Sequence, residues 1–116
     1  MNARKFFKSF RYAVQGILTA TKEQNLRFHI LSAVIVVLAG FLTGLSITEW
    51  VILTIVIALV IGAELFNSAI ERVVDLASPE IHPLAKQAKD MAAGAVLVFA
   101  VASVIIGLLI FLPKWF

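Results

Sequence analysis

The chain has 116 residues, of which 61% are hydrophobic and 15% are charged, and its formal net charge is +3. Soluble domains average about 45–50% apolar residues, so this composition excludes an ordinary water-soluble domain. It favours one all-α membrane domain over residues 1–116, with no more than three spans and short connections. The sequence contains no cysteine, which excludes disulfide and thiolate chemistry.

The N-terminal segment, about residues 4–20, has the pattern of an amphipathic helix. Its large apolar residues fall within one arc of a helical wheel, and basic residues fill the side beyond that arc. The apolar residues are Phe6, Phe7, Phe10, Val14, Ile17 and Leu18. A helix of this kind lies on an anionic membrane surface. It can act only as an anchor and topology signal, or it can also form one wall of a site at that surface.

Apolar stretches predict three spans, at about residues 28–48, 50–70 and 91–112. The uncharged runs at the first and third spans, residues 28–48 and 91–113, contain 21 and 23 residues, which are enough to cross about 30 Å of hydrocarbon as a helix. The middle stretch has only 14 residues between Glu49 and Glu64. These residues rise about 21 Å, so the span is expected to continue past Glu64.

That continuation makes Glu64 a carboxylate inside the membrane. Residues 50–63 could instead form a re-entrant or interfacial element, since apolar runs of 10–14 residues can do so. Pro79 and Pro83 mark a break before the last span.

The positive charges are distributed unevenly between the two sides of the predicted bundle. Nine of the ten Lys and Arg residues precede the first span or lie between the second and third, and only Lys114 lies on the other side. The positive-inside rule then places the N-terminus and residues 71–90 in the cytoplasm and the C-terminus outside the cell. Trp50, Trp115 and Phe116 would mark the outer interface. Topology thus accounts for the net charge, and no nucleic-acid partner is needed.

Four polar residues lie on one face of the middle helix, namely Glu64, Asn67, Glu71 and Asp75. At 100° per residue their directions fall on one stripe. Charged groups within a bilayer normally face a protein interior and mark a functional pathway. Oxygen ligands of this kind suit hard cations such as Mg²⁺.

A structural alternative is that basic residues simply neutralise the stripe. The candidates are Arg72, Lys86 and Lys89. This explanation suits Glu71 and Asp75 at the membrane surface, but it leaves the deeper Glu64 unexplained.

Two further charged pairs are predicted on the cytoplasmic side. Glu23 and Arg27 begin the first span, and Lys89 and Asp90 begin the third. Singly, they have structural explanations as an i,i+4 ion pair and a snorkelling lysine. Together with the stripe they provide what phosphoryl transfer requires, which is mostly positioning and charge neutralisation. The sequence has no Walker A loop or protein-kinase signature, so a nucleotide site would be of another type.

The segments ELFNSAIERVVD and HPLAKQAKDMAAGAVL resemble the small prokaryotic membrane diacylglycerol kinase family. They are most similar to the branch from Gram-positive bacteria whose members act as undecaprenol kinases. The resemblance implies a homotrimer of three-span subunits, each with an amphipathic surface helix, in the bacterial cell membrane. It also implies phosphorylation of a lipid alcohol with ATP and Mg²⁺.

The resemblance further assigns residue roles. Glu64 would be the general base, and Glu71 with Glu23 would hold Mg²⁺. Lys89 would meet the phosphates with Asp90 beside it. The other residues expected to line the site or lie near the nucleotide are Asn67, Asp75, Glu80, His82, Tyr12 and Gly16.

The helical rise agrees with this division of roles. Glu64 and Glu71 lie about 10.5 Å apart along the helix, which is too far to share one Mg²⁺ with ligands near 2.1 Å. The deeper carboxylate suits a lipid hydroxyl, and the shallower one suits a metal carried by a soluble nucleotide. Three thin spans would leave Glu64 facing lipid in a monomer, so the site is expected at subunit contacts.

Two other functions remain open at this point. The first is a diacylglycerol kinase, with the same chemistry on a different lipid. The second is a non-enzymatic ion- or proton-coupled membrane subunit in which Glu64 is the carrier site.

Overall fold

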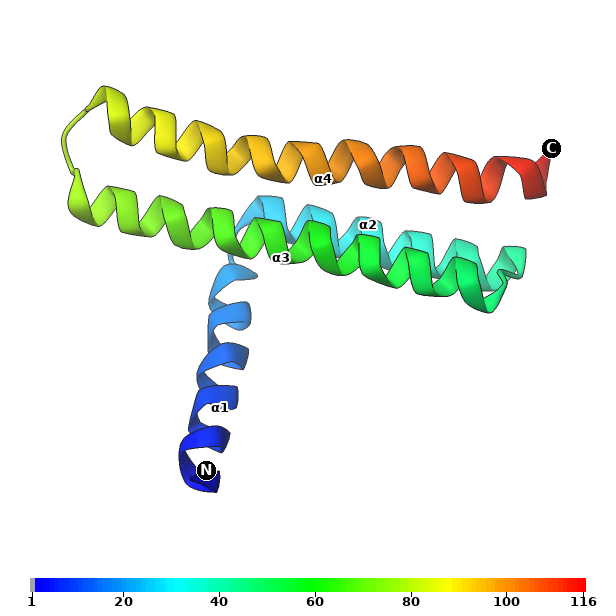
Figure 1. Ribbon diagram of the computed structural model, residues 1–116, viewed down its shortest axis with the longest axis horizontal. Coiled ribbons are helices and arrows are strands. Elements are labelled where there is room, and N and C mark those ends of the chain that lie inside the picture. Colours follow the sequence, from blue (N-terminus) through cyan, green and yellow to red (C-terminus); the bar gives the residue numbers. More distant parts are fainter. Residues whose placement is uncertain (1) are drawn as a thin grey trace.

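The computed structural model describes residues 2–116 and consists of four helices (Figure 1). They are α1 (Ala3–Ala20), α2 (Gln24–Thr43), α3 (Ile47–Ala77) and α4 (Pro83–Trp115). The last three are long and apolar enough to cross a membrane, with mean hydropathies of 2.0, 2.2 and 3.1. The prediction of an all-α membrane protein with three candidate spans is therefore confirmed.

The helices α3 and α4 extend further than the predicted spans. With 31 and 33 residues they are about 46 and 50 Å long, well beyond the roughly 30 Å of hydrocarbon. The extra turns continue past residue 70 and begin before residue 91. They are rich in Ala, Leu, Glu, Arg and Lys, which are good helix formers in water as well. Because α3 is one continuous helix, residues 50–63 are not a re-entrant element.

The first span ends earlier than predicted, at Thr43 instead of residue 48. Gly44 terminates α2 with a left-handed φ of +80°, a conformation that favours glycine. A capping box then starts α3, in which the Ser46 hydroxyl accepts from the Glu49 N–H at 3.2 Å. The Glu49 carboxylate accepts from the Ser46 N–H at 2.9 Å.

The break between α3 and α4 lies where the two prolines predicted it. Residues 78–82 form the connection, and Pro83 occupies the first turn of α4. Its missing N–H costs nothing at that position. The His82 imidazole caps the helix by accepting from the Leu84 N–H at 3.1 Å.

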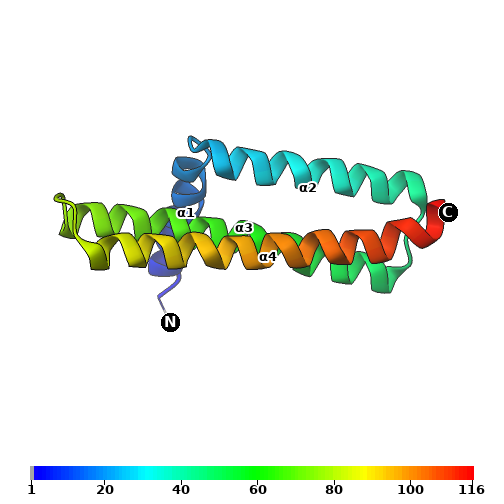
Figure 2. The same cartoon turned by 90° about the horizontal axis from the view of Figure 1, so that it is seen from above.

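Two of the spanning helices pack closely and the third stands apart. The helix α4 runs along α3, whereas Figure 2 shows α2 apart from both over most of its length; α2 contacts α3 more than it contacts α4. The helix α1 runs across the direction of the bundle (Figure 1). Its last turns meet α3 at a cavity lined by residues that include Gly16, Ser68 and Arg72. Residues 65–72 of α3 therefore lie at the level of α1, and the ends of α3 and α4 project beyond it.

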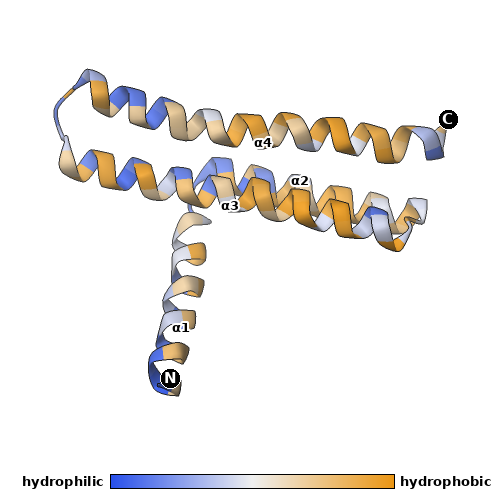
Figure 3. Cartoon of the chain, viewed as in Figure 1, coloured by the Kyte–Doolittle hydropathy of each residue, from blue (hydrophilic) through white to orange (hydrophobic). Residues whose placement is uncertain are grey.

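The two ends of the bundle differ in polarity. Hydrophilic residues gather toward the connection between α3 and α4, and apolar residues dominate the rest of the spans (Figure 3). We call the end with the 78–82 connection the acidic end. The opposite end, with residues 44–46 and the C-terminus, is the aromatic end. Most large apolar side chains of the spans are exposed in the single chain, as expected for a surface that lipid covers.

Candidate active site

The buried polar side chains among residues 2–116 lie together on α3. They are Glu64, Asn67 and Ser68, which are 2%, 5% and 2% exposed. The helical period places Glu64, Asn67 and Ser68 on the side of α3 that faces the other spans. Isolated buried charges are costly and require partners or a function. Glu64 is already buried within one chain, so the expectation that a monomer leaves it facing lipid was wrong.

The polar side chain that contacts Glu64 comes from α2. The Nε2 atom of His29 lies 3.7 Å from a carboxylate oxygen of Glu64, and both side chains are largely buried. Sequence reasoning did not single out His29. A histidine near the cytoplasmic end of an apolar span was the available signal, but its partner depends on how α2 packs against α3.

Asn67 links the deep and shallow parts of the stripe. Its amide nitrogen donates to the Glu71 carboxylate at 3.2 Å. Within residues 2–116 the buried Oδ1 atom of Asn67 has no hydrogen-bond partner. An orphaned buried acceptor costs about 1–3 kcal/mol and points to a ligand.

The donor set around Asn67 fits a magnesium ion. Carboxylate and amide oxygens are the ligands that Mg²⁺ takes, and Glu71 and Asn67 offer both. No three His, Asp or Glu residues among residues 2–116 are close enough to hold a metal by themselves. One or two carboxylates completed by substrate phosphates is the arrangement that Mg²⁺ usually adopts.

Glu23 connects α2 to α3 and is the other predicted metal ligand. One carboxylate oxygen accepts from the Arg72 guanidinium at 2.6 Å, and the other accepts from the Ser68 hydroxyl. The Ser68 hydrogen bond, followed by the Arg72 guanidinium, holds the pKa of Glu23 below its usual value. The interhelical pair with Arg72 replaces the local pair with Arg27 that the sequence suggested.

A second cluster of predicted residues lines a cavity at the acidic end. The cavity has a volume of about 300 Å³ and lies between the end of α3 and the start of α4. The predicted residues that line it are Asp75, Glu80, His82, Lys89 and Asp90. Lys89 pairs with Asp75, and Lys86 pairs with Asp90 at 2.6 Å.

The structural alternative of neutralised acids therefore holds for part of the stripe. Lys89 neutralises Asp75, as that alternative suggested. Glu71 instead contacts the neutral Asn67, and Glu64 contacts His29. Neutralisation by lysine or arginine therefore does not explain Glu64 and Glu71, and both stay candidates for functional residues.

The two predicted residues of α1 differ in position. Gly16 lines the cavity between α1 and α3 together with Ser68 and Arg72, so it lies beside the partners of Glu23. Tyr12 is 63% exposed on α1 and is not among the residues that line the cavities described here. The structure thus places Gly16 near the site residues of α3 and leaves Tyr12 at the edge of the site.

These features place a group of buried and paired polar side chains in a membrane protein, and comparison with known proteins identifies its class as that of membrane lipid kinases. Residues 11–111 match the prokaryotic diacylglycerol kinase family. The chain is 57% identical to an undecaprenol kinase of Bacillus subtilis over 111 residues, which is 95% of this chain and 90% of that protein. It is 44% identical to a diacylglycerol kinase of Synechocystis over 90% of this chain and 61% of that protein. It is 39% identical to a diacylglycerol kinase of Helicobacter pylori over 82% and 75%.

The chain belongs to the prokaryotic diacylglycerol kinase family. The predictions of a membrane lipid kinase and of ATP-dependent phosphoryl transfer are confirmed at the level of that family. A non-enzymatic carrier subunit is no longer needed to explain Glu64.

Proposed function

We propose that this protein phosphorylates undecaprenol with ATP at the cytoplasmic face of the bacterial cell membrane. The observation that carries the proposal is the 57% identity, over 95% of the chain, to a protein named undecaprenol kinase. The relatives named diacylglycerol kinase reach 44% and 39%. Diacylglycerol is the alternative acceptor.

Glu64 is proposed as the general base of the reaction. The lipid hydroxyl oxygen attacks the γ-phosphorus of ATP, the bond to the β–γ bridging oxygen breaks, and ADP leaves. The hydroxyl proton passes to the Glu64 carboxylate. Support comes from the depth of Glu64, which lies just inward of the level at which α1 crosses α3. A lipid hydroxyl just below the headgroups would reach that depth.

A magnesium ion would be held by Glu71 and Glu23, with the free Oδ1 of Asn67 beside them. When bound, it would neutralise charge on the β- and γ-phosphates. Glu71 has an oxygen beyond the one that Asn67 contacts. Glu23 would have to exchange the Arg72 guanidinium for the metal, which would leave Arg72 free to meet a phosphate.

The nucleotide is proposed to occupy the cavity between the ends of α3 and α4. Lys89 would pair with the phosphates in place of Asp75, and Asp90 would remain beside it. Glu80 and His82 would approach from the connection. From α1, Gly16 would approach the nucleotide through the neighbouring cavity between α1 and α3, and Tyr12 would lie at the edge of the site.

Charge and exposure support the proposed surface helix and orientation. In the single chain α1 exposes Phe6, Phe7 and Phe10, which suits an amphipathic helix lying in the cytoplasmic leaflet. The proposed topology has the N-terminus and the acidic end in the cytoplasm and the C-terminus outside. A cysteine label at the C-terminus should react from outside the cell, and one within residues 78–86 only after permeabilisation. The reverse pattern would place the acidic end away from ATP.

We further propose a homotrimer, as the family resemblance implies. The three spans form a thin bundle that buries few of its own side chains, and two cavities lie near the acidic end. Neighbouring subunits would close them. Crosslinking in detergent should give trimers, and full activity from a strictly monomeric preparation would contradict the proposal.

The substrate proposal is tested by direct competition. Purified protein in detergent receives labelled ATP with undecaprenol and diacylglycerol at equal mole fractions. We expect a higher kcat/KM for undecaprenol. A higher kcat/KM for diacylglycerol would make diacylglycerol the proposed acceptor in place of undecaprenol. The absence of lipid-dependent ATP consumption would contradict the kinase assignment.

A further inference from the structure

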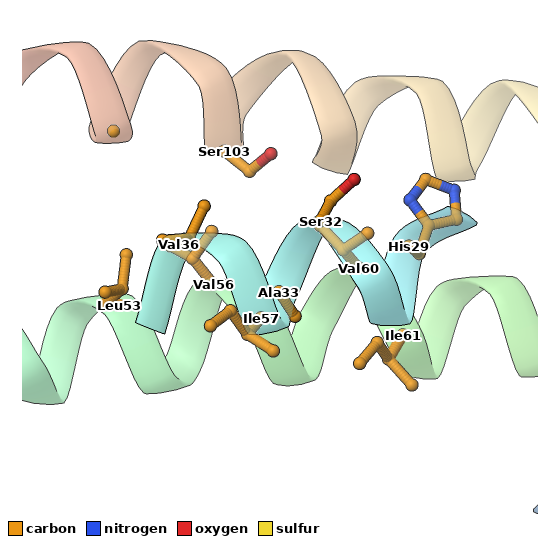
Figure 4. Close-up of a pocket in the computed structure, with 11 residues that line it drawn as sticks. His29, Ser32, Ala33, Val36, Leu53, Val56, Ile57, Val60, Ile61 and Ser103 are labelled. Carbon is orange, nitrogen blue, oxygen red and sulfur yellow. The ribbon is translucent and has the colours of Figure 1, made fainter. Parts of the chain in front are cut away.

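A cavity of about 100 Å³ lies among the three spanning helices. Figure 4 shows its lining in a row along the helices, with His29 at one end and Leu53 at the other. Ser32 and Val36 come from α2, while Ser103 comes from α4. It exists because α2 diverges from α4 over most of its length.

The cavity begins at His29, the partner of the proposed base. His29 belongs to its lining, and the Nε2 atom of the same residue lies 3.7 Å from Glu64. Leu53 lies about 16 Å outward of Glu64 along α3, at 1.5 Å per residue. The cavity therefore runs from His29, beside the carboxylate, toward the middle of the membrane. Its occupant would reside in the membrane and place a polar end beside Glu64.

The lining suits a hydrocarbon without ester groups. Branched aliphatic side chains such as Val56 and Val60 form most of it. The hydroxyl of Ser32 donates to the Phe28 carbonyl at 2.9 Å, and that of Ser103 donates to the Ala100 carbonyl at 2.6 Å. Because both hydroxyls donate within their own helices, ester carbonyls placed here would lose hydrogen bonds to water without replacing them. Such a loss costs about 1–3 kcal/mol per group.

The volume also limits the occupant. An apolar cavity of about 150 Å³ takes a molecule of the size of benzene. This cavity is smaller, at about 100 Å³, and takes part of a single chain. An adjoining hollow of about 420 Å³ between α2 and α4 shares His29, Ser32 and Gly107 with it. The remainder of a long chain would leave between α2 and α4 toward the lipid.

We infer that this cavity binds the isoprene unit next to the hydroxyl of a long-chain isoprenoid alcohol. His29 at its mouth holds Glu64 facing that hydroxyl. The inference rests on the proposed function and deepens it, since it gives the acceptor a site and a reason for preferring a polyprenol to a glycerolipid.

A filling substitution tests the site. Gly107 lines the cavity, and a Cβ added there would meet no atom of residues 2–116 within 4 Å. Gly107→Leu should therefore fold, fill the cavity and lower kcat/KM for undecaprenol at least tenfold, mainly through KM, with the KM for MgATP unchanged. The matched control is Gly94→Leu, because Gly94 is also half-buried on α4 with open space around it and lies outside the cavity lining. Equal effects of the two variants would overturn the inference.

A binding measurement on the unmodified protein needs no turnover. The probe is an undecaprenol analogue with a diazirine in the isoprene unit next to the hydroxyl. After irradiation, the label should map to residues 56–60 or 103–107, and unlabelled undecaprenol should compete with it. Labelling confined to α1 or to the exposed faces of the spans would overturn the inference. This labelling pattern is also the one expected if a second copy of the chain filled the cavity. If competition maps to the cavity while turnover favours diacylglycerol, the substrate proposal fails and the site stands.

Discussion

The two ends of the helical bundle use polar side chains in different ways. At the aromatic end the polar groups are paired: the Trp115 indole donates to the Thr43 hydroxyl at 2.9 Å, and Lys114 lies 3.0 Å from Glu49. At the acidic end the pairing is incomplete. Among residues 2–116, the ion-pair contact of Glu64 is with a histidine at 3.7 Å, and the Asn67 Oδ1 has no hydrogen-bond partner.

This difference separates structural contacts from functional ones. Satisfied contacts at the aromatic end close the bundle and stabilise it. Incomplete contacts at the acidic end cost stability in the isolated chain, and we expect ligands to complete them, as is common at functional sites. Substitutions at the acidic end should therefore change activity more than stability, and substitutions at the aromatic end should change stability more than activity.

The largest effect is expected at Glu64. Glu64→Gln removes the proposed base but leaves the Asn67–Glu71 contact in place. Turnover should fall by about 10²–10⁴-fold, while MgATP binds nearly as in the unmodified protein. Removing a buried charge should also leave the melting temperature unchanged or higher. Near-normal turnover would show that the stripe is structural.

Glu71→Gln should act on the nucleotide instead. The substitution removes a charge from the proposed Mg²⁺ site, so MgATP affinity should fall, and excess Mg²⁺ should partly restore it. The comparison is nucleotide affinity against kcat in this variant and in Glu64→Gln. If Glu64→Gln loses MgATP binding while Glu71→Gln keeps it, the two roles are inverted.

Some features of the acidic end could be predicted from the sequence because they depend on one helix or one connection. The helical period alone places Glu64, Asn67, Glu71 and Asp75 on one stripe, and the prolines mark the connection that gathers Glu80, His82 and Lys89. The structural alternative offered Lys89 as one of three basic residues that could neutralise the stripe, and Lys89 pairs with Asp75.

Contacts between helices could not be predicted in the same way. Glu23 finds Arg72 and Ser68, and His29 finds Glu64, only once α2 packs against α3. The burial of Glu64 in a single chain follows from the same packing. The early end of the first span was missed for another reason, since its boundary was set by the charge of Glu49. The signal in Gly44 and the Ser46 capping box was present in the sequence.

A smaller effect is expected on stability at Glu23. The pKa of this residue is lowered in the folded protein by Ser68 and Arg72. Its ionised form therefore stabilises the fold fully above its unfolded pKa of about 4.3, and this contribution is lost as pH falls through the lower folded value. Glu23→Gln should lower the free energy of unfolding by about 1 kcal/mol at pH 7, because Arg72 is half exposed and the pair is partly screened.

The measurement is thermal unfolding in detergent between pH 3 and pH 7. The difference between the unmodified protein and Glu23→Gln should shrink below about pH 4.3. Arg27→Gln is the matched control, because Arg27 lies one turn further along α2 and the carboxylate of Glu23 pairs with Arg72 instead. An equal loss in Arg27→Gln would show that the interhelical pair is not the source.

The smallest effect is expected at the aromatic end, where Trp115 reaches Thr43. Trp115→Phe removes the indole donor but keeps an aromatic ring beside Phe111, whose centroid lies 5.3 Å from that of Trp115. Hydrogen bonds between membrane helices average about 0.6 kcal/mol in double-mutant cycles. Trp115 is more than half exposed, so water or headgroups can replace the lost partner. A cycle with Thr43→Val should therefore give a coupling below about 1 kcal/mol, with kinase activity within twofold of the unmodified protein. A large loss of activity at unchanged stability would mean that the aromatic end communicates with Glu64, and the separation between the two ends would then be wrong.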